Sequence, residues 1–205
     1  MPSFIWPLDP MQAIVAFEQN FKAPQASALL MAAVSTVDSL YYLADLDAHD
    51  DLSQDTMCGH RPDVLDVAHS RWATGGCITA LDLCAAGLGR AFCNHTAVRE
   101  LSVPDMTTKK QAAKLTAKLP PVAKQWVIDI DADPDYQTVK LLRDTLVHAR
   151  VKRHYTIPRQ RLQIEAGSSR LAVPDVINLA RETATRHAFA LVQLLPSLRQ
   201  DPPIT

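Results

Sequence analysis

The sequence predicts an all-α protein, a helical bundle with one small β-hairpin before its last helix. Its composition favours a globular helical chain, because 47% of the 205 residues are hydrophobic and only six are glycine. Apolar residues recur every three or four positions along four stretches, at about 27–48, 62–94, 134–153 and 174–198. After the third stretch the pattern changes to an alternation around a turn. No repeat or internal boundary is apparent, so we expect a single domain over 1–205.

The N-terminal part predicts an irregular arm followed by two helices. Three prolines make residues 1–10 a poor helix, and a short helix is expected from Met11 to Phe21. Pro24 then begins a longer helix that runs to about Ala48. Its core side is predicted from apolar residues with a period near 3.6: Leu29, Leu30, Ala33, Val34, Val37, Leu40 and Tyr41. The acidic residues that follow have neither a ligand geometry nor a glycine turn and are interpreted as a solvated helix end and loop: Asp45, Asp47, Asp50 and Asp51.

A third helix is predicted from Pro62 to about Asn94. Its glycines weaken a helix by themselves, so we expect them to allow the close approach of a neighbouring helix: Gly75, Gly76, Gly87 and Gly89. The bulk of the core on this helix is expected from its larger apolar side chains: Trp72, Ile78, Leu81, Leu88 and Phe92. Cys77 and Cys84 lie two turns apart on one face and are expected to be small core residues.

Two Cys-x-His pairs stand at the ends of this helix, Cys58 with His60 and Cys93 with His95. A continuous helix between the pairs would hold them tens of ångströms apart, and neither their order nor their spacing is that of a structural zinc site. We therefore expect no metal and no cofactor.

The next stretch predicts a Lys- and Ala-rich helix from Thr107 to Leu119 that Pro120 and Pro121 end. Asp129, Asp131 and Asp133 imitate the start of a calcium-binding loop. That loop needs glycine at its sixth position and glutamate at its twelfth, where this chain has Pro134 and Lys140. Asp133 is instead expected to cap a helix whose first residue is Pro134.

The C-terminal part predicts a hairpin and a final helix. Arg161–Glu165 and Arg170–Val173 alternate on either side of an Ala-Gly-Ser-Ser turn, so a hairpin insertion is expected within 156–173. Pro174 then begins a helix to about Leu198. Its core face is expected from Val176, Ile177, Ala180, Ala184, Ala188, Leu191 and Leu195.

Charge is distributed unevenly along the chain, although the net charge is only −1. Residues 1–60 hold eight acidic residues against Lys22 alone, and residues 140–170 hold eight basic residues against two acidic ones, a net of +6. The basic region suits an anionic ligand, and a solvated charged face explains it equally well.

No secretory signal is evident, and no uninterrupted apolar run is long enough to span a membrane, since Asp82 breaks the best candidate. The four cysteines do not form a disulfide framework at this length, so a cytoplasmic protein is expected.

The stretch from Leu141 to Tyr155 is apolar on two sides of one predicted helix. One stripe is formed by Val139, Leu142, Leu146 and Ala149. The opposite side carries Val147, Val151 and Tyr155. Because only one stripe can face the core of the chain itself, we expect the second to form a homodimer interface.

Beside the second stripe stand Arg143, Asp144 and, four residues after Asp144, His148. These residues resemble the motif of the HEPN superfamily (higher eukaryotes and prokaryotes nucleotide-binding), which places Arg, a polar residue, a short spacer and His late in a helical bundle. Two other Arg–His pairs fit less well, because Arg90 is followed by an alanine and Arg181 by a glutamate. Many members of the family are metal-independent ribonucleases that act as dimers, and others are binding or regulatory modules without catalysis.

The resemblance implies a metal-independent endoribonuclease in which His148 is the acid/base, Arg143 binds the phosphate and Asp144 orients the imidazole. RNA contacts are expected from the basic residues that follow: Arg150, Lys152, Arg153 and His154. A surface network of charged side chains explains the same residues without catalysis. The alternative function is therefore a non-catalytic helical module that binds RNA, nucleotide or a partner protein, such as an antitoxin, in a defence or toxin–antitoxin system.

Overall fold

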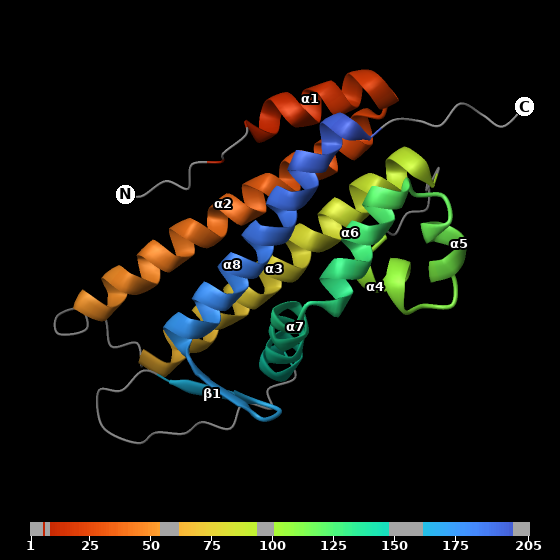
Figure 1. The fold of residues 1–205 in the computed structure, drawn as a ribbon. Coiled ribbons are helices and arrows are strands. Elements are labelled where there is room, and N and C mark those ends of the chain that lie inside the picture. The colour runs from red at the N-terminus through yellow and green to blue at the C-terminus, as the bar shows by residue number, and fades with distance from the viewer. Residues whose placement is uncertain (1–5, 7–8, 54–61, 94–100, 148–161, 199–205) are drawn as a thin grey trace, which may run out of the picture.

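The computed structural model describes residue 6 and residues 9–53, 62–93, 101–147 and 162–198 (Figure 1). The elements in chain order are α1 (Pro10–Phe21), α2 (Pro24–Ser53), α3 (Pro62–Phe92), α4 (Val103–Thr107), α5 (Ala112–Thr116), α6 (Pro121–Ala132), α7 (Pro134–Val147), β1 (Gln163–Ala166), β2 (Ser169–Ala172), α8 (Val173–Leu194) and the 3₁₀ turn η1 (Leu195–Ser197). The predicted fold class is confirmed: the structure is a helical bundle with one two-stranded antiparallel hairpin before its last long helix.

The centre of the bundle is formed by the long helices α2, α3 and α8 (Figure 1). The predicted core stripes of α2 and α8 are buried, apart from Leu29 and Tyr41 of α2, which are half-buried. Small residues on α3 bring α2 close. A β-carbon at Gly76 would lie 2.8 Å from Leu40 Cδ2, and one at Gly87 would lie 3.2 Å from the backbone oxygen of Ala26. The expected role of these two glycines is therefore confirmed.

By length and hydropathy, α2 over Pro24–His49 would suffice to cross a membrane. In this structure 44% of an apolar 18-residue window within that stretch is buried inside the bundle, and core helices of soluble proteins share these properties.

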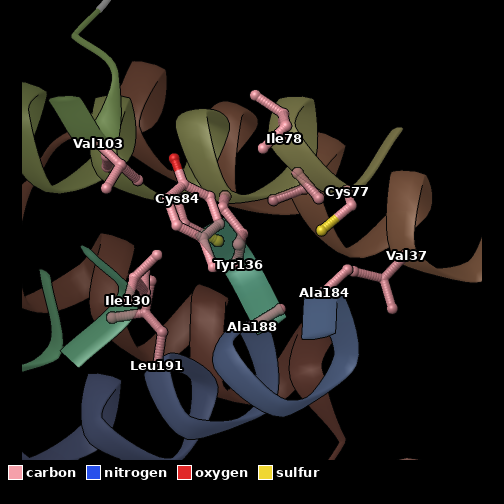
Figure 2. Packing of buried hydrophobic residues seen from close by; sticks show 14 of the residues in the cluster. Val37, Cys77, Ile78, Cys84, Val103, Ile130, Tyr136, Ala184, Ala188 and Leu191 are labelled. Carbon is pink, nitrogen blue, oxygen red and sulfur yellow. The ribbon is translucent and has the colours of Figure 1, made fainter. Parts of the chain in front are cut away.

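The junction of α3, α4, α6, α7 and α8 is filled by a cluster around Tyr136, the first large core residue of α7 (Figure 2). Figure 2 shows Tyr136 among side chains that come from α3, α4, α6 and α8, including Cys84, Val103, Ile130 and Leu191. Burial raises the pKa of the Tyr136 hydroxyl above its ordinary value. The hydroxyl therefore stays neutral at physiological pH, and Tyr136 serves as a core residue.

The structure differs from the prediction at two places between α3 and α7. The helix expected over Thr107–Leu119 is only the short α5, Ala112–Thr116, and Thr107 is instead the last residue of α4, which begins at Val103 behind a capping box of Ser102 and Asp105. The helix α6 was not predicted, although it supplies Trp126 and Ile130 to the core. Pro121 is its first residue, so the proline pair ends α5 and at the same time begins α6.

Trp72 was predicted to be a core residue, and this prediction is wrong. Its side chain is 64% exposed, whereas Ile78, Leu81 and Leu88 on the same helix are buried. Cys77 and Cys84 are buried as expected. Gly75 also differs from the prediction, since no neighbouring atom lies within 4 Å of a β-carbon added there.

The hairpin prediction is confirmed with a tighter turn. Ile164 pairs with Leu171 and Ala166 with Ser169, which leaves Gly167 and Ser168 as the two turn residues. Gly167 has a positive φ of 63°, a conformation that glycine adopts without strain.

Asp133 joins α6, α7 and α8. As predicted, it caps α7, accepting a hydrogen bond from the Asp135 amide at 2.9 Å. Its other oxygen lies 2.6 Å from His187 Nε2 and 2.8 Å from Arg186 Nη2. Burial raises the pKa of Asp133, but these hydrogen bonds and the Arg186 charge outweigh it and hold the pKa below its usual value.

We expect Asp133→Asn to lower the free energy of unfolding by about 1–3 kcal/mol at neutral pH. Because the folded-state pKa is depressed, the stabilisation is present above the ordinary aspartate pKa and is lost as pH falls through the folded pKa. The difference between wild type and variant should therefore shrink in acid. Urea unfolding at a series of pH values measures it, and a difference that stays constant down to the acid limit would contradict the assignment.

The two glycine environments give a matched pair of substitutions on α3. Gly75→Ala should stabilise the protein by roughly 0.5–1 kcal/mol, because alanine favours a helix and the space is open. Gly87→Ala should destabilise it, since overpacking costs roughly 1–3 kcal/mol and the nearby Ala26 carbonyl cannot move aside cheaply. Urea unfolding followed by tryptophan fluorescence at submicromolar protein separates the two. Equal stabilisation by both would contradict the close packing.

Candidate functional site

Arg143 and Asp144 lie on the solvent side of the last described turn of α7. The core side of this helix is formed by Val139, Leu142 and Leu146, which are fully buried. Arg143 Nη1 lies 3.2 Å from Asp144 Oδ1, and the two side chains are 43% and 50% exposed. The guanidinium group is thus accessible, and it shares its charge with a neighbouring carboxylate. Exposed pairs of this kind contribute little to stability.

Arg143 also interacts electrostatically with Asp82 on α3. Burial raises the pKa of Asp82, and a hydrogen bond of 2.9 Å from the Val103 amide together with the positive charge of Arg143 acts in the opposite direction. The positive charge of Arg143 therefore acts on a half-buried acid on α3 in addition to its pair with an exposed acid on its own helix.

Arg71 holds the end of α7 against α3. Its Nε and Nη2 donate hydrogen bonds of 3.1 and 2.7 Å to the backbone oxygen of Leu146, one turn after Arg143. A carbonyl near the C-terminus of a helix has no partner within the helix, and a guanidinium is a suitable donor for it. The sequence analysis missed Arg71, because a single arginine inside a helical pattern carries no local signal of a contact 75 residues away.

Asp66 on α3 contacts the backbone at Leu162, where the described part of the chain begins again. Its carboxylate accepts a buried hydrogen bond of 2.8 Å from the Leu162 amide. Asp66 and Arg71 are five positions apart on α3, about 7.5 Å along the helix axis. Leu146 and Leu162, which lie close to the two sides of the gap in the described chain, therefore both contact neighbouring turns of α3.

Much of the predicted site lies between these two points, outside the described residues. This applies to His148, to the dimer residues Val151 and Tyr155, and to the proposed RNA-binding residues Arg150, Lys152, Arg153 and His154. Val147 is described and is 56% exposed, as a residue on a second apolar stripe should be. The structure thus places Arg143, Asp144 and Val147 on the exposed side of one helix end.

A second polar pair, Asp47 with His69, was also missed. His69 Nδ1 lies 2.8 Å from Asp47 Oδ1, and both side chains are 5% exposed. One prediction is corrected here, because Asp47 was expected at a solvated helix end and loop, whereas its side chain is buried. The pair ties the last turns of α2 to the start of α3, and its burial makes it a structural tie rather than an open site.

The thiols of Cys77 and Cys84 are poor nucleophiles. Burial raises the pKa of Cys84 to about 12 and also raises the pKa of Cys77, so both remain protonated thiols at neutral pH. No group of three His, Cys, Asp or Glu side chains in the described ranges could hold a metal ion.

An apolar cleft of about 400 Å³ opens between α2 and α3. It is lined by Ser39, Leu40, Tyr42, Leu43, Leu46 and Trp72. Most of the lining is apolar, so the cleft can hold an apolar group, with the Ser39 and Tyr42 hydroxyls as its polar side-chain groups.

Comparison of the chain with protein-family models, curated proteins and solved structures finds no match.

Replacing Arg71 should weaken the attachment of α7. Arg71→Met removes both hydrogen bonds to the Leu146 carbonyl, and we expect a loss of about 1–3 kcal/mol in the free energy of unfolding. Arg71→Lys should lose less, because an ammonium group can still donate one bond. The control is Arg170→Met, which removes an exposed arginine from β2 and should change stability by less than about 0.5 kcal/mol. Chemical denaturation measures all three variants. Equal effects of Arg71→Met and Arg170→Met would contradict a specific role for Arg71.

Proposed function

We propose that this protein is a metal-independent endoribonuclease of HEPN type that uses Arg143, Asp144 and His148. The observation that supports this proposal most is the position of Arg143. It is an exposed guanidinium on the last described turn of α7, in the helical context that the motif requires. A phosphate can approach it from solvent.

The chemistry follows from the residue types. The 2′-hydroxyl of the ribose attacks the adjacent phosphorus, the bond from phosphorus to the 5′-oxygen of the next nucleotide breaks, and a 2′,3′-cyclic phosphate and a 5′-hydroxyl remain. A histidine serves for both proton transfers, because imidazole accepts and donates protons near neutral pH. Arg143 binds the phosphate oxygens with two parallel hydrogen bonds, and its charge does not titrate away. Asp144 lies one turn before His148 in the sequence and favours the charged imidazole.

The proposed assembly is a homodimer, since Arg143 and His148 are about 140° apart on a helix and converge most easily across a two-fold axis. The sequence prediction places that interface at Val147, Val151 and Tyr155. A cytoplasmic location also remains part of the proposal.

The second candidate function is a non-catalytic module that binds RNA, nucleotide or a partner protein. The hydrogen bond between Arg143 and Asp144 favours it, because a paired guanidinium binds phosphate less readily than a free one. The two candidates differ in whether RNA is cut.

Incubation of the purified protein with mixed RNA in EDTA tests the proposal. Wild type should cut RNA and leave cyclic phosphate ends. His148→Ala should lower the rate by about 10²–10⁴-fold, because it removes the proton-transfer group. Arg143→Lys should also be strongly impaired, since an ammonium cannot bind phosphate with two parallel bonds. Asp144→Asn should be milder.

The matched control is Arg170→Met, a basic residue on the hairpin, which should keep the wild-type rate. Circular dichroism and the sedimentation coefficient of each variant should equal those of wild type. If wild type and His148→Ala cut RNA equally, or if neither cuts any RNA, the catalytic assignment fails. RNA binding without cleavage would support the second candidate.

A further inference from the structure

Lysines gather on the part of the bundle that runs from the end of α4 through α5 to the start of α6. Between Asp105 and Asp129 the sequence holds five lysines and no acidic residue, although acidic residues outnumber basic ones in the whole chain. The five are Lys109, Lys110, Lys114, Lys118 and Lys124, and all of them are exposed. Figure 1 places α5 at an outer edge of the molecule, beside α4. We call these five residues the lysine surface.

The packing of α5 leaves its lysines outside the core. The buried residues of this short helix are Ala112 and Thr116. Lys114 and Lys118 are four positions apart, so they lie close to one side of the same turn. The chain enters α6 at Pro121, and Lys124 lies on the first turn of that helix. The lysines therefore follow one another along the exposed chain from α5 into α6.

Four of these lysines carry a charge that no acidic residue compensates. Lys109 Nζ lies 2.6 Å from Asp105 Oδ1, and the other four make no ion pair with any residue in the described part of the chain. Soluble surfaces normally intersperse charges of both signs. A surface of a single sign attracts ligands of the opposite sign. The lysine surface thus suits an anionic partner.

The side chains around the lysines favour a phosphate backbone over a protein. Lysine is depleted in protein–protein interfaces, whose centres are rich in aromatic residues, methionine and arginine. The single aromatic residue between Asp105 and Asp129 is Trp126, which is buried. The exposed polar neighbours of the lysines are Thr108, Gln111 and Gln125. Lysine, threonine and glutamine are all common hydrogen-bond donors to the phosphates of nucleic acids.

An anionic membrane fits this surface less well. A helix that lies on a membrane inserts large apolar side chains, such as Trp, Phe or Leu, beside its basic residues. The helix α5 is only five residues long, and the large apolar side chains that are exposed nearby are Val122 and Ile128 of α6. Bases would find no exposed aromatic ring to stack on, so binding should depend on phosphates and not on base sequence.

We propose that the lysine surface binds the phosphate backbone of an RNA strand without reading its base sequence. The inference deepens the proposed function, on which the choice of RNA rests, by giving the substrate a binding surface on elements other than α7. It assigns RNA contacts to lysines of the described bundle, in addition to the basic residues predicted after His148.

Fluorescence anisotropy of the full chain with a labelled 2′-O-methyl RNA oligonucleotide tests the proposal. This RNA lacks the free 2′-hydroxyl that attacks phosphorus, so binding is measured without cleavage. The logarithm of the association constant should fall linearly with the logarithm of the salt concentration, by about 0.7 for each phosphate that the protein neutralises on a single strand. Oligonucleotides of different base sequence should bind with similar affinity.

The double variant Lys114→Gln with Lys118→Gln should lower the magnitude of this slope by about 1.4. It should also weaken binding roughly 25-fold at about 0.1 M salt, the value that two lost contacts give by counterion release alone. The matched control is Lys22→Gln with Arg170→Gln, which removes the same charge from exposed residues on other parts of the molecule. The control should keep the wild-type slope, and circular dichroism confirms that both variants are folded.

Cleavage of unmodified RNA in EDTA, measured with the same variants, separates this inference from the proposed function. Selective loss of binding in the lysine variant supports the inference even if wild type cuts no RNA. If wild type cuts RNA but the lysine variant binds the 2′-O-methyl RNA as the control does, the inference fails and the nuclease assignment stands. A wild type that binds vesicles containing phosphatidylserine and not the RNA overturns the inference in favour of a membrane surface.

Discussion

The close approach of α2 and α3 is the constraint on which the rest of the structure depends. A methyl group at Gly76 would meet the Leu40 side chain, and one at Gly87 would meet Leu30 and the Ala26 carbonyl, so α2 packs directly against these positions of α3. Two helices packed this closely form a layer about 30 residues long. The helices α8 and α7 pack against this layer, and Tyr42 and Trp72 are exposed on it. The same packing therefore creates both the core and the exposed apolar cleft.

Aspartate side chains join the other elements to this layer. The carboxylate of Asp66 accepts a hydrogen bond from the Leu162 amide, and that of Asp82 accepts one from the Val103 amide, so two acidic residues of α3 hold residues near the starts of two described parts of the chain. Asp47 ties the end of α2 to His69, and Asp133 joins α7 to His187 of α8. In each case a charged side chain is held by hydrogen bonds to a distant part of the chain, which makes its burial tolerable. The acidic character of the chain thus partly serves its internal connections.

The candidate nuclease motif lies at the edge of this framework. Arg71 donates hydrogen bonds to the carbonyl of Leu146, and Asp66 accepts one from the Leu162 amide, so these two described residues are held on neighbouring turns of α3. Arg143 remains exposed one turn before the anchor. A rigid support next to an accessible cationic group suits the binding of an anionic substrate.

The sequence by itself determined the helices with strong apolar periodicity, the hairpin and the helix start at Asp133 and Pro134, because these depend on local spacing and capping. The sequence also predicted that Arg143 and Asp144 lie on the side of their helix away from the buried stripe of Val139, Leu142 and Leu146. The local sequence pattern did not identify α6. The pair Pro120–Pro121 was interpreted only as the end of the preceding helix, although Pro121 is also the first residue of α6. Tertiary structure alone decided that Trp72 faces solvent while Asp47 is buried. A helical period shows that residues share a side but does not say which side the neighbouring helices cover. The same limit hid Arg71 and the His69–Asp47 pair, because their partners are distant in sequence and only the packing of α2, α3 and α7 brings them within hydrogen-bonding distance.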